Sequence, residues 1–250
     1  MTNIGNYAAH ARFWDWGGHD RSCEHEHWLQ YAKKYGNTAL SPMCAWGETA
    51  AYMATRGMVA IGLDGTPEMV NQGIARFAHI PGFHIYEGDI RNFKLNIPPI
   101  DFCFCVDFGH LQNMDEIASA ISCINRHMRV GGGFVIEAGI RLQSDTTADF
   151  PKQTFHPQTQ IYPDMHVWKI SRNRYDAKLA RRYISQIFFA KHADGSIESF
   201  DHDFYLQEYY QEQWLEMLAD CGFVIKGEFT DRNGTSWNGE KSWIVEAVKV

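Results

Sequence analysis

The chain has 250 residues, of which 45% are hydrophobic, 14% aromatic and 21% charged. This composition is that of a folded globular protein and excludes a disordered, collagen-like or coiled-coil chain. With 23 basic and 30 acidic residues the formal net charge is -7, which disfavours a nucleic-acid partner because the overall field repels phosphate. The length predicts one large domain, or one domain with a small added lobe.

Cysteine usage and the absence of long apolar runs bear on location. The six cysteines lie in apolar runs without the paired spacing of a zinc site or a disulfide framework, so we expect buried free thiols in a reducing compartment. The first eleven residues lack the pattern of a signal peptide, and no run approaches the roughly 20 apolar residues that cross a membrane. The sequence therefore predicts a cytoplasmic protein with no membrane partner. A monomer and a homodimer are both compatible with it.

Short apolar runs alternate with helical patterns between residues 38 and 138. Continuous apolar runs are typical of parallel strands that helices cover on both faces. The pattern predicts strands at 38–43, 59–63, 83–86, 102–106 and 134–138, and helices at 48–55, from Pro67 onward, and at 114–128. The glycines at 131–133 are expected to form the turn before the fifth strand. These units predict a doubly wound α/β fold.

The pattern changes after residue 139 to polar and aromatic stretches. Two runs, 183–191 and 197–205, flank a turn that contains Asp194 and Gly195, which is typical of an antiparallel hairpin. A last helix is predicted at 211–220, followed by closing strands at 223–229 and 242–248. The alternation in the second closing strand predicts an antiparallel edge strand. The whole chain is therefore expected to form a mostly parallel seven-stranded sheet with a small antiparallel lid inserted after the fifth strand.

Three of the predicted strands end on a carboxylate, at Asp64, Asp89 and Asp107. Because ligands of an open parallel sheet bind beyond the carboxyl ends of its strands, this recurrence predicts a small-molecule site at that edge. The turn from Cys44 to Gly47 opens a helix whose N–H groups and dipole can receive a negative group, and Asp64 is placed to accept from two ribose hydroxyls. Singly, Asp64 is equally compatible with a helix cap and Gly47 with a tight turn. Together the features predict a nucleoside cofactor.

Five motifs then occur in a fixed order: A-L-S-P-M-C-A-W-G-E-T at 39–49, Arg56-Gly57, G-L-D-G-T-P-E-M at 62–69, Gly88-Asp89-Ile90, and R-V-G-G-G at 129–133. In this order they resemble the class I S-adenosylmethionine-dependent methyltransferases over about residues 38–138. The stretch D-F-G-H-L-Q at 107–112 is also similar to the segment after strand four in small-molecule enzymes of the glycine N-methyltransferase type.

The resemblance implies S-adenosylmethionine (SAM) as cofactor and a nitrogen or oxygen of a small molecule as methyl acceptor, a flat heterocycle or an amine among the candidates. It implies that Asp64 holds the ribose diol, that Asp89 and Ile90 flank the adenine, and that the first turn passes beneath the methionine part. The residues expected on the cofactor are Ser41, Met43, Cys44, Gly47, Asp64, Gly65, Met69, Asp89, Ile90, Asp107 and Phe108. On this basis the chain divides into a helical and aromatic flap (1–37), a cofactor-binding core (38–138), a lid or substrate region (139–210) and a closing segment (211–250).

Catalysis asks little of the protein, because a sulfonium is already a strong electrophile and in-line approach supplies most of the rate. His110 is the candidate general base, since imidazole titrates near neutrality, although an orienting or packing role fits it as well. Asp107 is the candidate for electrostatic contact with an acceptor amine.

Aromatic and basic residues give the candidates on the substrate side. The segment 7–16 concentrates rings, and Tyr7 and Trp14 are candidates to enclose a sulfonium or a flat acceptor, unless the segment only packs on the sheet. Arg174 lies in a basic stretch that suits an acceptor carboxylate or simply exposed charge. His25 and His27 would point to different sides of a helix, so no metal site is predicted.

The first motif departs from the family pattern, which has an acidic residue at the position of Ser41, glycine at Met43 and Ala45, and a small residue at Trp46. Ser41 offers no carboxylate to the cofactor's amino group, and side chains at 45 or 46 would obstruct the close backbone approach that glycine permits. Two other functions are therefore kept: a non-catalytic SAM-binding relative, and a nicotinamide-dependent oxidoreductase. The second fits poorly, because the turn lacks G-x-G-x-x-G.

Overall fold

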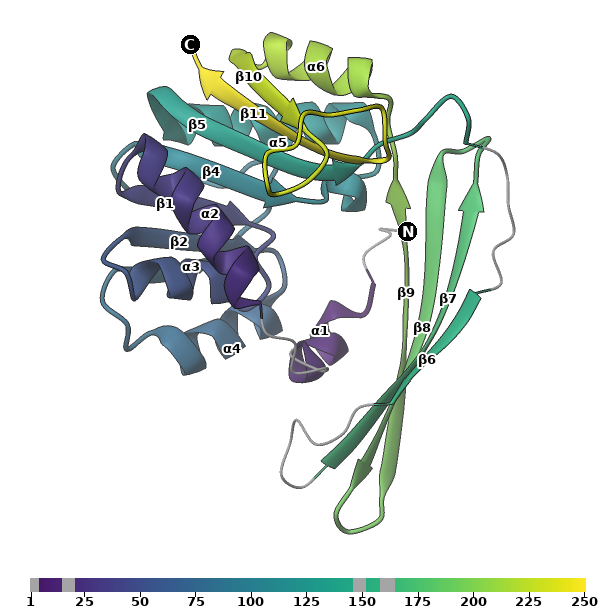
Figure 1. Cartoon of the computed structure of the whole chain (residues 1–250). Coiled ribbons are helices and arrows are strands. Elements are labelled where there is room, and N and C mark those ends of the chain that lie inside the picture. Colours follow the sequence, from purple (N-terminus) through teal and green to yellow (C-terminus); the bar gives the residue numbers. More distant parts are fainter. Residues whose placement is uncertain (1–4, 15–20, 146–151, 158–164) are drawn as a thin grey trace.

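The computed structural model describes residues 5–14, 21–145, 152–157 and 165–250. They form a seven-stranded sheet that is flanked by helices, and a four-stranded antiparallel sheet that stands beside it (Figure 1). The predicted α/β fold with its seven-stranded, mostly parallel sheet is thereby confirmed.

Five parallel strands make up most of the large sheet: β1 (Thr38–Pro42), β2 (Val59–Asp64), β3 (Phe83–Glu87), β4 (Ile100–Val106) and β5 (Met128–Gly139). The strand order is β10-β11-β5-β4-β1-β2-β3, so β1 lies between β2 and β4. After β1 the chain continues to β2 and β3 on one side of β1, and after β3 it crosses to β4 and β5 on the other side. This reversal leaves a crevice at the carboxyl ends of β1 and β4, where ligands of such sheets bind.

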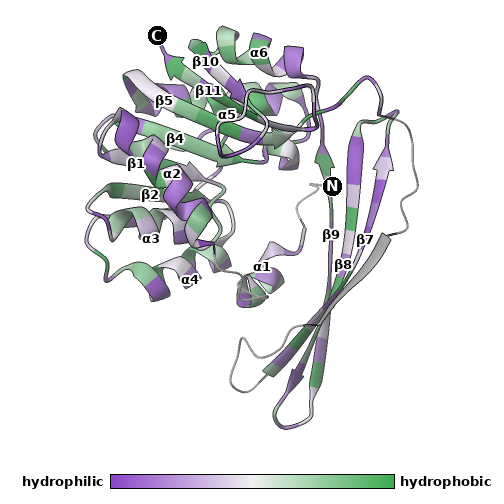
Figure 2. Ribbon diagram, viewed as in Figure 1, coloured by the Kyte–Doolittle hydropathy of each residue, from purple (hydrophilic) through white to green (hydrophobic). Residues whose placement is uncertain are grey.

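Helices cover both faces of the large sheet: α2 (Ser22–Tyr35), α3 (Glu48–Ala54), α4 (Pro67–Phe77), α5 (Met114–His127) and α6 (Gln211–Asp220). One core cluster joins α2 and α3 to the sheet through residues such as Trp28 and Phe102, and another joins α5 and α6 through Ile121 and Trp214. Figure 2 shows mostly hydrophobic residues along the central strands and mixed polarity along the antiparallel sheet. Burial on both faces explains the continuous apolar runs of the sequence.

The closing strands are β10 (Phe223–Phe229) and β11 (Ser242–Lys249), both antiparallel to their neighbours. The prediction that the last strand lies at the edge is wrong, because β11 is inserted between β5 and β10, and β10 forms the edge. Five consecutive residues of β11, from Trp243 to Ala247, are buried. Helices cover both faces of this strand, so alternation in the sequence did not mark exposure.

The glycines at 131–133 also depart from the prediction, since they lie inside β5 and not in a turn before it. Met128 pairs with Ile100 and Gly133 with Phe102, so the residues between them bulge out of the ladder. Gly131 has a φ of +76°, a backbone conformation that favours glycine.

We call the second sheet, made of β6 (Lys152–Pro157), β7 (Met165–Asp176), β8 (Arg181–His192) and β9 (Ile197–Gln207), the inserted sheet. The predicted hairpin is confirmed as β8 and β9, with Tyr183 opposite Tyr205 and Lys191 opposite Ile197. Strands β6 and β7 were not predicted. Strand β7 buries only one face, and its other face carries polar and charged residues that hide an apolar pattern.

The N-terminal segment, with α1 (Tyr7–His10) and the 3₁₀ helix η1 (Ala11–Phe13), lies between the two sheets and contacts α4 and β9. Phe13 packs against Val167 and Phe188 of the inserted sheet. The last two residues of the predicted aromatic segment, 15 and 16, lie outside the described residues.

The predictions on cysteines and on membrane crossing concern the whole chain. All six cysteines are free thiols, but only three are buried, and Cys23 is exposed, contrary to expectation. No helix in the described ranges combines the length and hydrophobicity needed to cross a bilayer.

Candidate active site

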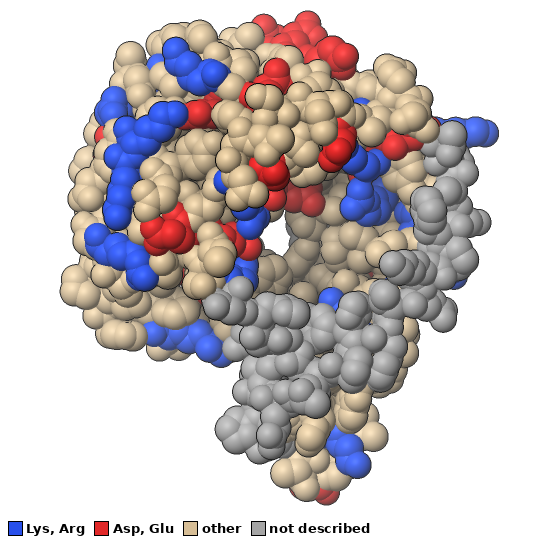
Figure 3. Space-filling view, in the orientation of Figure 1, with Lys and Arg blue, Asp and Glu red and all other residues tan. Residues whose placement is uncertain are grey.

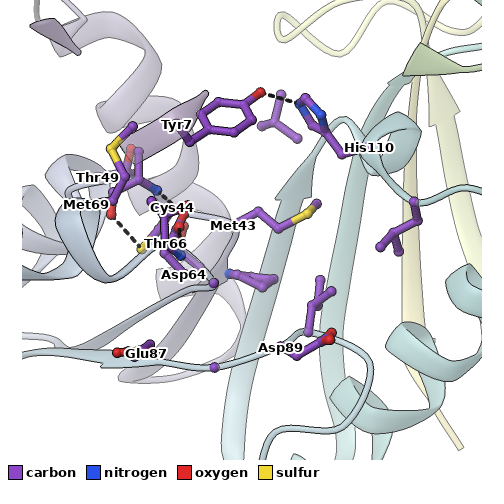
Figure 4. Close-up of a pocket in the computed structure, with 18 of the residues that line it drawn as sticks. Tyr7, Met43, Cys44, Thr49, Asp64, Thr66, Met69, Glu87, Asp89 and His110 are labelled. Atoms are coloured by element: carbon purple, nitrogen blue, oxygen red, sulfur yellow. Dashed lines mark hydrogen bonds between the residues drawn. The ribbon is translucent and has the colours of Figure 1, made fainter. Parts of the chain in front are cut away.

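A cavity of about 620 Å³ opens beyond the carboxyl ends of β1, β2 and β4, at the reversal of strand order. This volume is typical of sites for small molecules and cofactors. The cavity brings together most of the residues that the sequence singled out: Tyr7, Trp14, Ser41, Met43, Cys44, Asp64, Gly65, Met69, Asp89, Ile90 and His110. Figure 4 shows Tyr7 and His110 on one side of the cavity and Glu87 and Asp89 on another, with Asp64 between them.

Four of the proposed site residues do not line the described cavity wall. Gly47, with a φ of +77°, precedes α3, and Asp107 lies behind the wall at the end of β4. Phe108 is fully buried in the core against Trp214. Arg174 lies on the inserted sheet, 4.4 Å from the ring centre of Tyr183.

The first turn keeps the backbone course expected of a glycine-rich loop although two of its glycines are replaced. Met43 and Ala45 both have φ of 51°, and Gly47 has 77°. Left-handed conformations cost a residue with a side chain about 1–3 kcal/mol, so the surrounding fold must hold them in place. The first turn therefore follows the backbone path of a glycine loop, with backbone strain at Met43 and Ala45.

Trp46 does not obstruct the cavity. Its side chain is 1% exposed, and its indole Nε1 donates to the backbone oxygen of Ala11 at 3.1 Å. The guanidinium carbon of Arg76 lies 3.9 Å from the ring centre. Trp46 thus ties the N-terminal segment to the first turn, which explains why a large residue stands where a small one was expected.

Asp64 joins the first two turns. Its Oδ2 accepts from the Ala45 N–H at 2.7 Å and its Oδ1 accepts from the Thr66 N–H at 2.9 Å. Burial raises the pKa of Asp64, against the opposing effect of these backbone donors. Each carboxylate oxygen retains a second lone pair, so Asp64 can act as a cap and still accept from a ligand hydroxyl.

Beyond Asp64, an ion-pair network closes the end of the cavity that Asp89 and Ile90 line. The Arg91 Nε donates to both oxygens of Asp89, at 2.9 and 3.0 Å, and its Nη1 donates to Glu116 at 2.9 Å. The hydrogen bond from Arg91 lowers the pKa of Asp89. Glu116 also accepts from the Gln112 N–H at 2.8 Å, so the network fixes the loops after β3 and β4 against one another.

His110 and Tyr7 form the opposite wall. The Tyr7 hydroxyl and His110 Nε2 are 3.1 Å apart, and both side chains are half-buried. Burial lowers the pKa of His110, which the charge of Asp107 opposes, so the imidazole is neutral near pH 7. Asp107 sits at a φ of 62°, and its Oδ1 accepts from the Gly109 N–H at 2.9 Å, which starts the 3₁₀ helix η2 (Phe108–His110) that carries His110.

Two further histidines lie behind Tyr7, and the sequence analysis missed them. His202 of β9 lies with its ring centre 4.6 Å from that of Tyr7 and 4.7 Å from that of His10. Burial, with nearby positive charge, lowers the pKa of His10 to about 3, and burial lowers that of His202 to about 4. The alternation of side chains between the two faces of β9 was the only signal in the sequence that His202 faces inward.

Arg21, at the start of α2, is a second missed feature: Glu24 stands three residues after it, but no spacing in the sequence links it to Glu48. It donates to Glu24 at 2.6 Å and to Glu48 at 3.1 Å, and all three side chains line the cavity. Burial opposes its charge, yet these carboxylates raise the pKa of Arg21.

The comparisons with known proteins agree with this geometry. Residues 39–132 match the family model described as a methyltransferase domain. With the seven-stranded fold, this match confirms the resemblance to class I methyltransferases.

Solved structures are similar over nearly the whole chain at low sequence identity. DesVI of Streptomyces venezuelae has a TM-score of 0.76 and 15% identity, covering 98% of this chain and 99% of its own. The sugar N-methyltransferase KedS8 from Streptoalloteichus sp has a TM-score of 0.76 and 18% identity, covering 98% and 94%. SAM-bound CalS10 of Micromonospora echinaspora, an amino pentose methyltransferase, has 0.70 and 19%, covering 98% and 96%. No curated protein matches the sequence.

Proposed function

We propose that this chain is a SAM-dependent methyltransferase that methylates a nitrogen or oxygen of a small polar molecule, with an amine as the first candidate. The observation that carries this proposal is the cavity at the strand reversal, with Asp64 and the left-handed first turn at its centre and the neutral Tyr7–His110 pair on its wall. The similar structures described as amino pentose and sugar N-methyltransferases favour the amine.

The residues of the cavity fit the cofactor. Asp64 offers acceptor lone pairs for ribose hydroxyls, and we propose that Asp89 and Ile90, which line the same cavity, flank the adenine. Arg21 and its carboxylate partners supply charges for the amino-acid end. When bound, SAM supplies a methyl group on a positively charged sulfur, and transfer needs a nucleophile in line with that bond.

The protein's own part concerns the proton of the acceptor. A protonated amine has no free lone pair, so it must lose a proton before its nitrogen can bond to the methyl carbon. The Tyr7 hydroxyl lines the cavity and can accept this proton while it donates its own to His110 Nε2, 3.1 Å away. His110 then holds the proton, and the acceptor nitrogen is left with the lone pair that methyl transfer requires.

The inserted sheet acts as a lid in this proposal. The Tyr205 hydroxyl of β9 donates to the side-chain oxygen of Gln112, a cavity residue, at 2.6 Å. Figure 3 shows an opening between the core and the inserted sheet, with charged side chains at its core side. We propose that the acceptor enters there and that the sheet excludes water from the transfer.

Transfer of a labelled methyl group from SAM to a panel of matched amines and alcohols, amino sugars included, tests this function. The expected result is transfer to an amine, with kcat lowered about 10²- to 10⁴-fold in both His110→Gln and Tyr7→Phe, because either change breaks the proton relay from the acceptor. His79→Gln, an exposed histidine, is the matched control and should keep full activity. SAM binding without transfer to any acceptor would favour the non-catalytic relative, and transfer unaffected by His110→Gln would remove the proton-accepting role.

The first turn bears on that non-catalytic alternative. Loss of the family glycines would suggest a collapsed turn, yet Met43 and Ala45 keep positive φ and Trp46 points away from the cavity. These features support a working cofactor site.

A further inference from the structure

The cofactor's amino-acid end poses a problem that this chain must solve in its own way. It carries an ammonium and a carboxylate, and both need partners when they leave water. Ser41, where a carboxylate is expected in the family pattern, is buried, lines the cavity and has no charge. Another acidic side chain of the cavity is the strongest partner available for the ammonium, because a carboxylate makes a charge-assisted hydrogen bond with it.

Most carboxylates of the cavity already have partners or lie at its other end. Glu87 is of the second kind, since it ends β3 beside Asp89, at the end proposed for the adenine (Figure 4). Asp64 accepts two backbone N–H groups, and Asp89 and Glu116 are held by Arg91. Glu24 has both oxygens on guanidinium groups: Oε1 lies 2.6 Å from Arg21, and Oε2 lies 3.4 Å from Arg232.

Glu48 differs from these carboxylates because one of its two oxygens is available to accept a hydrogen bond from a ligand. Its Oε2 accepts from Arg21 Nη1 at 3.1 Å, and no contact within the described chain engages its Oε1. It stands directly after Gly47, at the end of the same turn that begins with Ser41, and its side chain is 26% exposed. Arg21 holds it from the start of α2, so its position is fixed before a ligand arrives.

We propose that Glu48 supplies the carboxylate that binds the α-ammonium of the cofactor, in place of the acidic residue missing at Ser41. This inference rests on the proposed function. The charge has moved from the start of the first turn to its end, and the Glu24–Arg21–Glu48 bridge keeps it aimed at the cavity. A charge-assisted hydrogen bond from an ammonium to Glu48 contributes to affinity without touching the reacting methyl group.

The test compares two ligands by isothermal titration: S-adenosylhomocysteine and its deaminated analogue, in which hydrogen replaces the α-ammonium. In Glu48→Gln we expect affinity for S-adenosylhomocysteine to fall about tenfold to hundredfold, the range for a lost hydrogen bond to a charged group. Affinity for the deaminated analogue should stay within about twofold, because that ligand has no group for Glu48 to bind. The same measurement reports whether the variant cavity is intact.

Glu68→Gln is the matched control, since it removes an exposed carboxylate from the first turn of α4, outside the cavity. It should leave the difference between the two ligands as in the wild type. An equal loss for both ligands in Glu48→Gln would mean that Glu48 acts only by holding Arg21, and no loss would mean that it binds nothing; either overturns the inference. If the wild-type chain binds neither ligand, the proposed function itself fails.

Discussion

His10 makes the fold sensitive to pH. Its ring is 8% exposed, neither ring nitrogen has a hydrogen-bond partner in the described chain, and the rings of Phe188 and His202 lie 4.7 Å from it. Its pKa is about 3 in the folded protein, against 6.5 for the unperturbed group. Because the folded pKa is lower, the unfolded state binds more protons below pH 6.5, and stability is lost as the pH falls through that value.

The size of the effect follows from the pKa values. Between pH 6.5 and pH 5 the unfolded chain gains a proton that buried His10 does not take up, which costs about 2 kcal/mol at 1.36 kcal/mol per pH unit. His202, with a pKa of about 4, should add a similar loss. The variant His10→Phe keeps a ring of similar size, removes both unpaired nitrogens, and should raise stability at pH 7.5 by about 1–3 kcal/mol.

Urea unfolding of wild type and His10→Phe at pH 7.5 and pH 5 measures both effects. The wild type should lose about 2 kcal/mol more than the variant between the two pH values. His79→Gln, an exposed histidine, should behave as the wild type. Equal losses in wild type and His10→Phe, or a variant that is less stable at pH 7.5, would refute the burial of a neutral His10.

Variants at two further positions probe the first turn and the lid. Ala45 has a φ of 51°, so Ala45→Gly should keep the free energy of unfolding within about 1 kcal/mol of the wild type. Ala45→Val should lower it by about 1–3 kcal/mol, because a β-branched residue fits that conformation poorly. Thermal unfolding measures both effects, and equal effects of the two variants would contradict backbone strain at this position. Tyr205→Phe removes the 2.6 Å bond to Gln112, and we expect lower kcat/KM for methyl transfer with thermal stability within about 1 kcal/mol of wild type; unchanged kinetics would argue against the lid.

Much of the core could be predicted from the sequence because its signals are local. Apolar runs that end on Asp64 and Asp89 place both carboxylates at the same sheet edge, and the structure brings both to one cavity. The third carboxylate, Asp107, follows the same rule, but its positive φ turns the chain, and it supports His110 from behind the wall. Local sequence does not reveal such a change in the direction of the chain.

The missed features depend on contacts between distant segments. Arg21 meets Glu48 because α2 packs beside α3, and Tyr7 meets His202 because α1 contacts β9. Trp46 had suggested an obstructed turn, but its burial against Ala11 could be recognised only in three dimensions. Similarly, the strand β7 escaped prediction because its buried face includes Ser171 as well as apolar residues.

The binding of SAM in the cavity beside Asp64 is the central claim, and isothermal titration tests it most directly. The wild-type chain should bind SAM and S-adenosylhomocysteine with micromolar affinity and should not bind NAD. In Asp64→Ala that affinity should fall at least about tenfold, because ribose hydroxyls lose a charged acceptor and the first turn loses its tether at Ala45. Binding of NAD but not SAM, or SAM binding that Asp64→Ala leaves unchanged, would contradict the account.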